Sequence, residues 1–211
     1  MTAPAGAGVR IGAEAPALAA YAAVPIAFTV HERLELAPDA GALAGLPLVV
    51  RPLATPYVKD HDADAASHPV SWAHRFDISR WAFLVARLDG RRIGGAAVIP
   101  PGASDALVDG AGATALLWDL RVAPDVRGGG VGTALFEAAC AWARTEGAQR
   151  LEVETQNVNV PACRFYAARG CTLGAVHRFV YPALPEEMQL LWYRDVNDGP
   201  RRRARGAPRH V

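Results

Sequence analysis

Residues 120–135 read LRVAPDVRGGGVGTAL, and they join a buried strand to an amphipathic helix through a glycine-rich turn. The preceding residues 116–122 are apolar apart from Asp119 and Arg121, which is typical of a mostly buried strand. After the glycines, apolar residues recur at helical spacing, which predicts a helix over residues 130–145. The first turn of such a helix presents unpaired N–H groups, and glycines leave room for a ligand beside them. The stretch therefore predicts a phosphate-binding corner.

The spacing of the glycines limits which known phosphate-binding motif this stretch can match. A Walker A loop needs a lysine after the glycines, but the single lysine of the chain is Lys59. The dinucleotide fingerprint needs a third glycine that this stretch lacks. The pattern that fits is Arg-x-x-Gly-x-Gly, formed by Arg127, Gly130 and Gly132. A tight corner without any ligand is the alternative that the glycines alone leave open.

Composition predicts an ordinary soluble domain. The chain has 211 residues, of which 51% are hydrophobic and 20% charged. No apolar stretch approaches the roughly 20 residues that span a bilayer, and no signal peptide is evident, so we expect a cytoplasmic protein without a membrane partner. Its three cysteines, Cys140, Cys163 and Cys171, lack metal-ligand spacing. We therefore expect buried thiols and no metal.

Charge is unevenly distributed along the chain. Residues 201–211 contain five arginines and no acid, whereas the first 200 residues carry 17 basic and 21 acidic side chains. An acidic body suits a cationic substrate better than nucleic acid, so no nucleic-acid partner is expected. We predict a flexible segment over residues 1–25, a folded domain over 26–195 and a basic disordered tail over 196–211. The acidic stretch 57–64 is either a wall that attracts a cationic amine or a solvated loop.

The remaining pattern predicts a sheet around the central strand. Asp89-Gly90 is a favoured hairpin turn between two apolar runs. A strand, a crossover helix and a second strand at this spacing form a parallel pair with a right-handed connection. Further strands are predicted over residues 81–88, 92–99, 149–156, 173–180 and 188–194.

A second motif follows the second strand of that pair. Residues 157–170 read NVNVPACRFYAARG, in which Pro161 and Gly170 frame a short helix with Asn159 as its N-cap. The pattern Asn-x-x-Ala-x-x-x-Tyr-x-x-x-Gly, after the Arg-x-x-Gly-x-Gly motif, resembles the two conserved blocks of the GNAT acetyltransferases. Within that family, residues 152–174 look most like the streptothricin acetyltransferases. The resemblance covers residues 81–194, and residues 1–56 show nothing that aligns.

The resemblance implies a fold and a donor. The fold is α/β of the α+β type, with a central, mostly antiparallel sheet of six to seven strands, a splayed parallel pair at its centre and flanking helices. The donor is acetyl-CoA, whose pyrophosphate is bound by backbone amides. The residues that the resemblance assigns to acetyl-CoA are Leu120, Arg121, Val122, Arg127, Gly128, Gly129, Gly130, Val131, Gly132, Thr133, Asn159, Ala162 and Tyr166.

It also implies how the reaction proceeds. Acyl transfer to an amine needs a base, and Asp119 and Glu154 are the candidates, because each extends from a strand expected to line the cleft. The sequence does not separate them. The family uses a backbone N–H of the central strand, here near Arg121 or Val122, to stabilise the carbonyl oxygen. Tyr166 would protonate the leaving thiolate, and an acyl-enzyme on Cys163 is rejected because no histidine supports it.

The leading functional hypothesis is an enzyme that moves the acetyl group of acetyl-CoA directly to a primary amine of a small cationic molecule. A streptothricin-like antibiotic is one candidate acceptor, and a homodimer is one candidate assembly. Acetylation of a protein N-terminus or lysine is an alternative within the same class. A non-catalytic acyl-CoA sensor is the alternative from another class.

Overall fold

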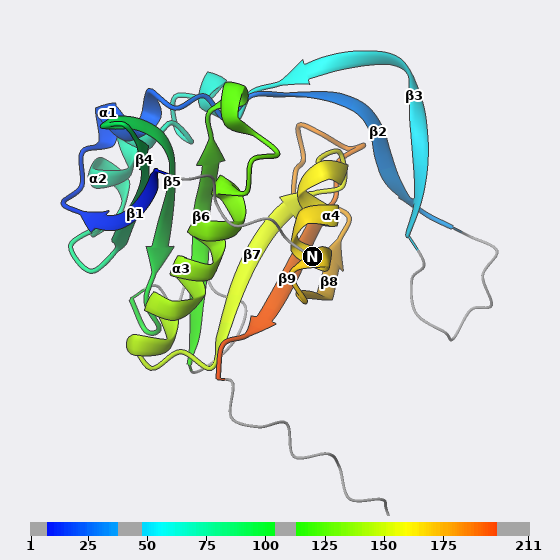
Figure 1. Cartoon of the computed structure of the whole chain (residues 1–211). Helices are drawn as coiled ribbons and strands as arrows, with labels where there is room; N and C mark the ends of the chain where they lie inside the picture. The colour runs from blue at the N-terminus through cyan, green and yellow to red at the C-terminus, as the bar shows by residue number, and fades with distance from the viewer. Residues whose placement is uncertain (1–7, 38–47, 104–112, 198–211) are drawn as a thin grey trace, which may run out of the picture.

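The computed structural model describes residues 8–37, 48–103 and 113–197, which form a main sheet of seven strands and a separate two-stranded ribbon (Figure 1). The main sheet has the order β1-β4-β5-β6-β7-β9-β8, and only the β6–β7 pair is parallel. This confirms the predicted mixed, mostly antiparallel sheet. Its strands are β1 (Val9–Glu14), β4 (Ala82–Leu88), β5 (Arg91–Ile99), β6 (Thr114–Val122), β7 (Arg150–Gln156), β8 (Thr172–His177) and β9 (Gln189–Asp195).

Helices cover both faces of this sheet. They are α1 (Leu18–Ala22), α2 (Trp72–Arg75), α3 (Val131–Thr145) and α4 (Val160–Ala168). Adjacent residues of a strand point to opposite faces, and in β4 Phe83 belongs to a cluster with Tyr21 and Trp72, whereas Leu84 belongs to one with Leu135. Helices α1 and α2 therefore cover one face and α3 the other. No helix in the described ranges is long and apolar enough to cross a bilayer.

The N-terminal segment differs from the prediction. Residues 1–25 were expected to be flexible, yet β1 pairs antiparallel with β4 from Val9 opposite Leu88 to Glu14 opposite Phe83. Tyr21 of α1 is only 1% exposed. The alanines and glycines of this segment hide its strand pattern because small side chains give a weak periodic signal. Residues 1–7 and 198–211, with most of the predicted tail, lie outside the described residues.

A long ribbon connects the N-terminal segment to the rest of the chain. Strands β2 (Phe28–Leu36) and β3 (Leu48–Lys59) pair only with each other, and Figure 1 shows the ribbon arching away from the main sheet. At its near end Phe28 is paired with Lys59. A short 3-10 helix, η1 (His61–Ala63), follows directly. The ribbon therefore brings residues distant in sequence to the centre of the sheet.

The central unit β6–α3–β7 forms as the sequence predicts. Parallel pairing of β6 with β7 runs from Thr114 opposite Arg150 to Leu117 opposite Val153, and then stops. On its other side, β6 has a register shift against β5 at this same level, which marks a β-bulge at Trp118. Beyond this point β6 and β7 splay apart, and a cleft opens between them.

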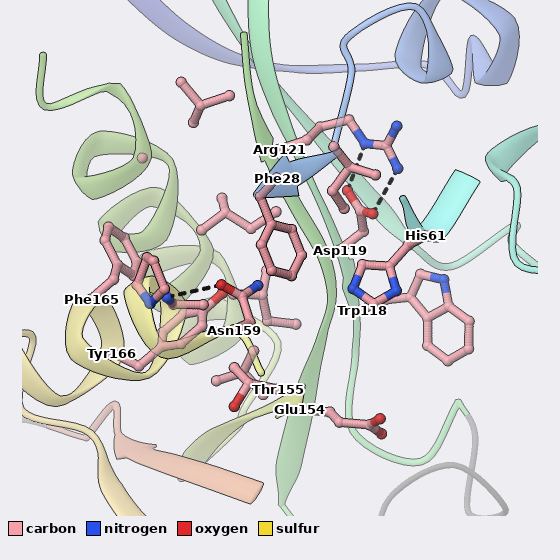
Figure 2. Close-up of a pocket in the computed structure, with 18 of the residues that line it drawn as sticks. Phe28, His61, Trp118, Asp119, Arg121, Glu154, Thr155, Asn159, Phe165 and Tyr166 are labelled. Carbon is pink, nitrogen blue, oxygen red and sulfur yellow. Dashed lines mark hydrogen bonds and ion pairs between the residues drawn. The ribbon is translucent and has the colours of Figure 1, made fainter. Parts of the chain in front are cut away.

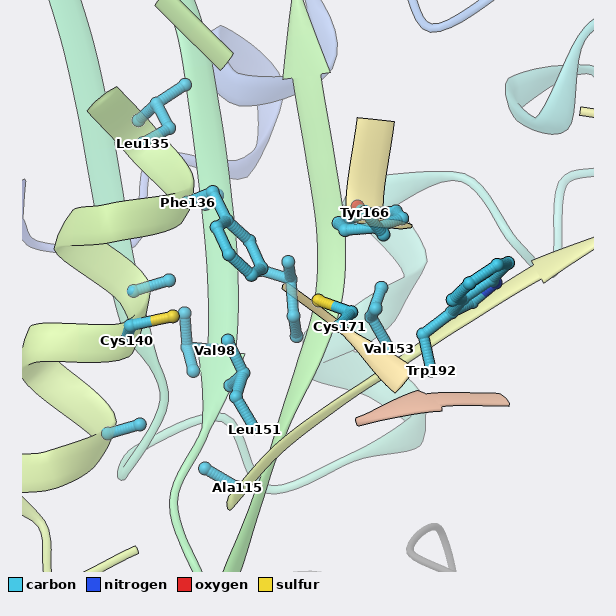
Figure 3. Packing of buried hydrophobic residues seen from close by; sticks show 14 of the residues in the cluster. Val98, Ala115, Leu135, Phe136, Cys140, Leu151, Val153, Tyr166, Cys171 and Trp192 are labelled. Atoms are coloured by element: carbon cyan, nitrogen blue, oxygen red, sulfur yellow. The ribbon is translucent and has the colours of Figure 1, made fainter. Parts of the chain in front are cut away.

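The core that fixes this geometry lies between α3 and the sheet (Figure 3). Leu135, Phe136 and Ala139 of α3 are fully buried against apolar residues of β4, β5 and β6. Removal of an aromatic ring from such a core typically costs about 3–5 kcal/mol. Because α3 starts at the glycine turn, this packing also fixes the N-terminus of α3 at the mouth of the cleft.

Candidate active site

The cleft between the splayed strands has a volume of about 1490 Å³. Its walls come from β6, β7, the glycine turn, the first turn of α3 and helix α4. Figure 2 shows Asn159 and Tyr166 on one side of it and His61, Trp118 and Asp119 on the other, with Phe28 between them. Both sequence motifs therefore face one cavity.

The glycine turn has the geometry of an anion site. Gly128 and Gly130 adopt positive φ angles of 80° and 87°, a left-handed conformation that favours glycine. Gly130 is the N-cap of α3 and provides no side-chain cap, and the N–H of Ala134 is the first to donate within the helix, at 3.0 Å to the Gly130 carbonyl. The N–H groups of residues 130–133 therefore remain available to a phosphate, whereas that of Gly129 donates to the Val126 carbonyl at 3.3 Å.

The residues of the glycine turn that were predicted to bind acetyl-CoA line the cleft, apart from the side chain of Val131. Gly128, Gly129, Gly130, Gly132 and Thr133 line the cleft. The side chain of Val131 does not, because it packs into the core and is 3% exposed. Its contribution to a phosphate site is thus restricted to its backbone N–H.

Arg127 is engaged elsewhere. Its guanidinium donates hydrogen bonds to three backbone carbonyls, those of Val122 at 2.9 Å, Ala27 at 3.1 Å and Pro25 at 3.2 Å. These bonds tie the segment before β2 to the end of β6. The structure thus gives Arg127 a bracing role at the edge of the cleft that it lines, and the phosphate contact that its place in the motif predicts stays a prediction.

Arg169 is a cation at the turn that was not predicted from the sequence. It lines the cleft and donates to the hydroxyl of Thr133 and, at 2.9 Å, to the carbonyl of Phe165. Its guanidinium carbon lies 3.6 Å from the centroid of the Phe165 ring. Its Nε is buried and has no hydrogen-bond partner among the described residues. The feature of the sequence that could have pointed to Arg169 is its position in the second motif, three residues after Tyr166.

The backbone of β6 provides donors to the cleft. The N–H of Ala123 donates to the Ile93 carbonyl of β5 at 2.8 Å. Successive N–H groups of a strand alternate in direction, so the N–H of Arg121 also points toward β5. Those of Leu120 and Val122 point toward the open edge, where β7 has separated. Of the two predicted oxyanion donors, only Val122 has an N–H that faces the cleft.

The side chain of Arg121 is the centre of a buried charge network. All five of its N–H donors are used: two on Asp119 at 2.8 and 2.9 Å, two on Asp62 at 2.9 and 3.2 Å, and one on the Val24 carbonyl at 3.1 Å. The guanidinium also lies over the Tyr21 ring at 4.9 Å. No side-chain donor remains for acetyl-CoA, so any contact of Arg121 with the cofactor would be made by its backbone, and that assignment stays a prediction.

The same network limits how many further hydrogen bonds the nearby carboxylates can accept. Asp119 accepts a third hydrogen bond, from the Tyr21 hydroxyl at 2.6 Å, so three of about four acceptor positions on its carboxylate are filled. Asp62, from the acidic stretch, compensates Arg121 and does not form a charged wall. Asp60 caps η1 by accepting from the N–H of Asp62 at 3.0 Å.

Glu154, the second candidate base, lies on β7 and lines the cleft. One carboxylate oxygen accepts from the Tyr181 hydroxyl and the other from the Gln189 side chain at 2.7 Å. It is more exposed than Asp119 and has no cationic partner within ion-pair distance among the described residues. Glu154 is therefore the less compensated of the two carboxylates.

The second motif forms the opposite wall. Asn159 caps α4 as predicted, because its side chain accepts from the N–H of Ala162 at 3.2 Å. Tyr166 is 5% exposed and lines the cleft. Burial, and secondarily the negative charge of Asp119, raises the pKa of Tyr166, so its hydroxyl stays protonated at neutral pH. Cys163 is buried and shares a hydrogen bond with Thr155 at 3.4 Å.

The cleft ends in an aromatic wall that was not predicted from the sequence. Phe28 and His61 face each other with ring centroids 6.0 Å apart, and Trp118 and Trp72 continue the wall. These residues come from β2, η1, β6 and α2, so only the tertiary fold brings them together. No group of three potential metal ligands occurs within the described ranges.

Comparison with known proteins gives consistent matches. The profile of the acetyltransferase (GNAT) family matches residues 53–171. Streptothricin acetyltransferase A of Bacillus subtilis (strain 168) is 42% identical over 81 residues, which cover 37% of this chain and 47% of that protein. The matched part of the chain thus spans less than half the length of that relative.

Two further matches cover more of the chain. Streptothricin acetyltransferase of Streptomyces lavendulae is 30% identical over 142 residues, 67% of this chain and 71% of that protein. The crystal structure of nourseothricin acetyltransferase aligns with a TM-score of 0.69 and 26% identity, covering 90% of this chain and 99% of that one.

Proposed function

The chain belongs to the GNAT acetyltransferase family, and from this premise we propose that it transfers the acetyl group of acetyl-CoA directly to a primary amine of a small cationic molecule. A streptothricin-like antibiotic is the leading acceptor, in keeping with the relatives that are named for that substrate. The observation that carries the proposal is the cleft itself, which joins an anion-binding helix terminus to a buried tyrosine between two splayed strands.

The glycine turn fits the phosphates of the donor. The N–H groups of residues 130–133 would bind the pyrophosphate, and a group of favourable charge at an exposed helix N-terminus contributes about 0.3–1 kcal/mol. Arg169, with a buried Nε and a place at the same turn, would add a positive charge.

The strands between which the thioester would lie provide the electrostatics. The N–H of Val122 would donate to the carbonyl oxygen of the acetyl group, where negative charge develops as the amine attacks. The protonated Tyr166 would donate its proton to the departing sulfur, and its buried position keeps that proton in place until the thiolate forms.

The acceptor must lose a proton before it can attack. An alkylamine resembles lysine with a pKa of about 10.4, so only about 1 in 2,500 molecules is neutral at pH 7. That deficit corresponds to about 4.6 kcal/mol at 1.36 kcal/mol per pKa unit. Glu154, with no cation beside it, would attract the ammonium group. Asp119 and Glu154 are the bases that the sequence predicts, and each carboxylate already accepts hydrogen bonds from neighbouring side chains.

Release of thiol from acetyl-CoA with a panel of small cationic amines, streptothricin among them, tests the proposal. Amine-dependent turnover is expected, with the highest kcat/KM for the antibiotic. Donor binding without turnover on any amine would refute it and would favour a protein acceptor or a sensor. A matched control is Tyr166→Phe, which keeps the aromatic core and removes only the hydroxyl.

A further inference from the structure

His61 is held at the aromatic wall of the cleft by its neighbours in the chain. Its 3-10 helix η1 is capped by Asp60 and fastened to the centre of the sheet by Asp62, which accepts two hydrogen bonds from Arg121. Figure 2 shows the imidazole beside Asp119 and Trp118, across the cleft from Tyr166. The side chain is therefore positioned by two fixed residues that flank it within a single turn.

The imidazole is chemically less engaged than the two carboxylates. Asp119 receives three hydrogen bonds, two of them from the buried guanidinium of Arg121. Glu154 receives hydrogen bonds on both oxygens, from Tyr181 and Gln189. His61 makes ring contact with Phe28 and no side-chain hydrogen bond with any residue that the structure describes. Its nitrogen is thus available to a substrate proton.

The surroundings keep this imidazole neutral. Burial lowers the pKa of His61 below its usual 6.5, and the positive charge of Lys59 lowers it further. Glu187, Asp119 and Asp60 act in the opposite direction. Lys59 and Glu187 largely compensate each other, because they form an ion pair at 2.5 Å. A neutral imidazole at pH 7 can accept a proton, whereas an imidazolium cannot.

We propose that His61 is the general base that deprotonates the acceptor amine, an assignment that rests on the proposed acetyl transfer. The ammonium group gives one proton to His61, and the neutral nitrogen then attacks the thioester carbonyl. The N–C bond forms and the C–S bond breaks, and Tyr166 gives its proton to the sulfur. The attacking nitrogen then loses a second proton to solvent, and solvent restores the proton of Tyr166. His61 releases its own proton to solvent. The sum is one amide, one thiol and one free proton.

The test compares His61→Gln with wild type and with His31→Gln, a control in which the histidine is exposed on β2. Initial rates are measured against pH with acetyl-CoA and two acceptors, an ordinary alkylamine and an amine whose own pKa lies below the assay pH. A general base typically contributes about 10²–10⁴-fold. For the alkylamine at pH 7 we therefore expect His61→Gln to lower kcat/KM by about 10²-fold or more, and His31→Gln to leave it unchanged.

Two further readouts separate a base from a structural residue. For the amine that is already neutral, His61→Gln is expected to lower kcat/KM by only a small factor. The pH–rate profile of His61→Gln is expected to lack the acidic limb that wild type shows below pH 6.5. Equal losses for both acceptors, or a rate near wild type, would overturn the assignment. Acetyl-CoA binding and thermal unfolding are measured for His61→Gln and for His61→Asn, so that a folding defect is recognised in either variant. A wild-type enzyme inactive on every amine would instead refute the proposed function itself.

Discussion

Replacement of Arg121 with methionine is expected to destabilise the protein strongly, because it leaves two carboxylates without their cation. The Arg121 side chain is 1% exposed, and those of Asp119 and Asp62 are 9% and 14% exposed. Removal of one partner from a buried ion pair typically costs about 3–5 kcal/mol. With a urea m-value of about 2 kcal/mol/M, the unfolding midpoint should fall by about 1.5–2.5 M.

Equilibrium urea unfolding, followed by tryptophan fluorescence, measures this loss. The matched control is Arg150→Met, since Arg150 pairs with Asp195 at the surface, where the side chains are 61% and 71% exposed. Such a pair contributes at most about 1 kcal/mol. Neutralisation of both acids by asparagine in the Arg121→Met background should recover part of the stability. A loss below about 1 kcal/mol for Arg121→Met, equal to the control, would refute the argument that the two buried carboxylates depend on this guanidinium for their stability.

Three other expectations follow from the same geometry. Tyr166→Phe should lower kcat by about tenfold or more with little change in acetyl-CoA affinity, and an unchanged kcat would remove Tyr166 from the mechanism. Gly130→Ala and Gly102→Ala both force a side chain into a left-handed conformation, with φ of 87° and 67°, and each should cost about 1–2 kcal/mol of stability. Only Gly130→Ala should also weaken acetyl-CoA binding in a calorimetric titration, and equal affinities would contradict the anion site. Burial raises the pKa of Cys140 to about 12 and of Cys171 to about 11. Native protein at pH 8 should therefore resist iodoacetamide by mass spectrometry until urea is added, and rapid labelling of either thiol without urea would show that it is accessible.

The parts of the fold that depend on local pattern are the parts that the sequence predicted. Helix α3 and strands β6 and β7 have long apolar repeats, and the Asp89-Gly90 turn has the positive φ angles, 50° and 82°, that its residue types favour. Strand β1 was missed because it is short and none of its side chains is buried, so that its pairing with β4 decides its conformation. Tertiary pairing overrides weak local preference at that edge of the sheet.

In the candidate site too, local motifs were predictable from the sequence and long-range contacts were not. The glycine turn, Asn159 and Tyr166 were predictable because each belongs to a motif within one short stretch. The partners of Arg127 were not, because the three carbonyls that it contacts include those of Pro25 and Ala27, about a hundred residues away. The engagement of Asp119 with Tyr21 and Arg121 likewise depends on how α1 packs on the sheet. Phe28 and His61 reach the cleft only through the β2–β3 ribbon.

The most direct test of the proposed activity is the stoichiometry of one reaction mixture that contains the protein, acetyl-CoA and streptothricin. Thiol is quantified spectrophotometrically, and the antibiotic is analysed by mass spectrometry in the same samples. Direct transfer predicts one acetylated amine for every thiol released, and no acetyl group on the protein. Thiol released without acetylated antibiotic, or an acetylated protein intermediate, would contradict direct transfer to this acceptor.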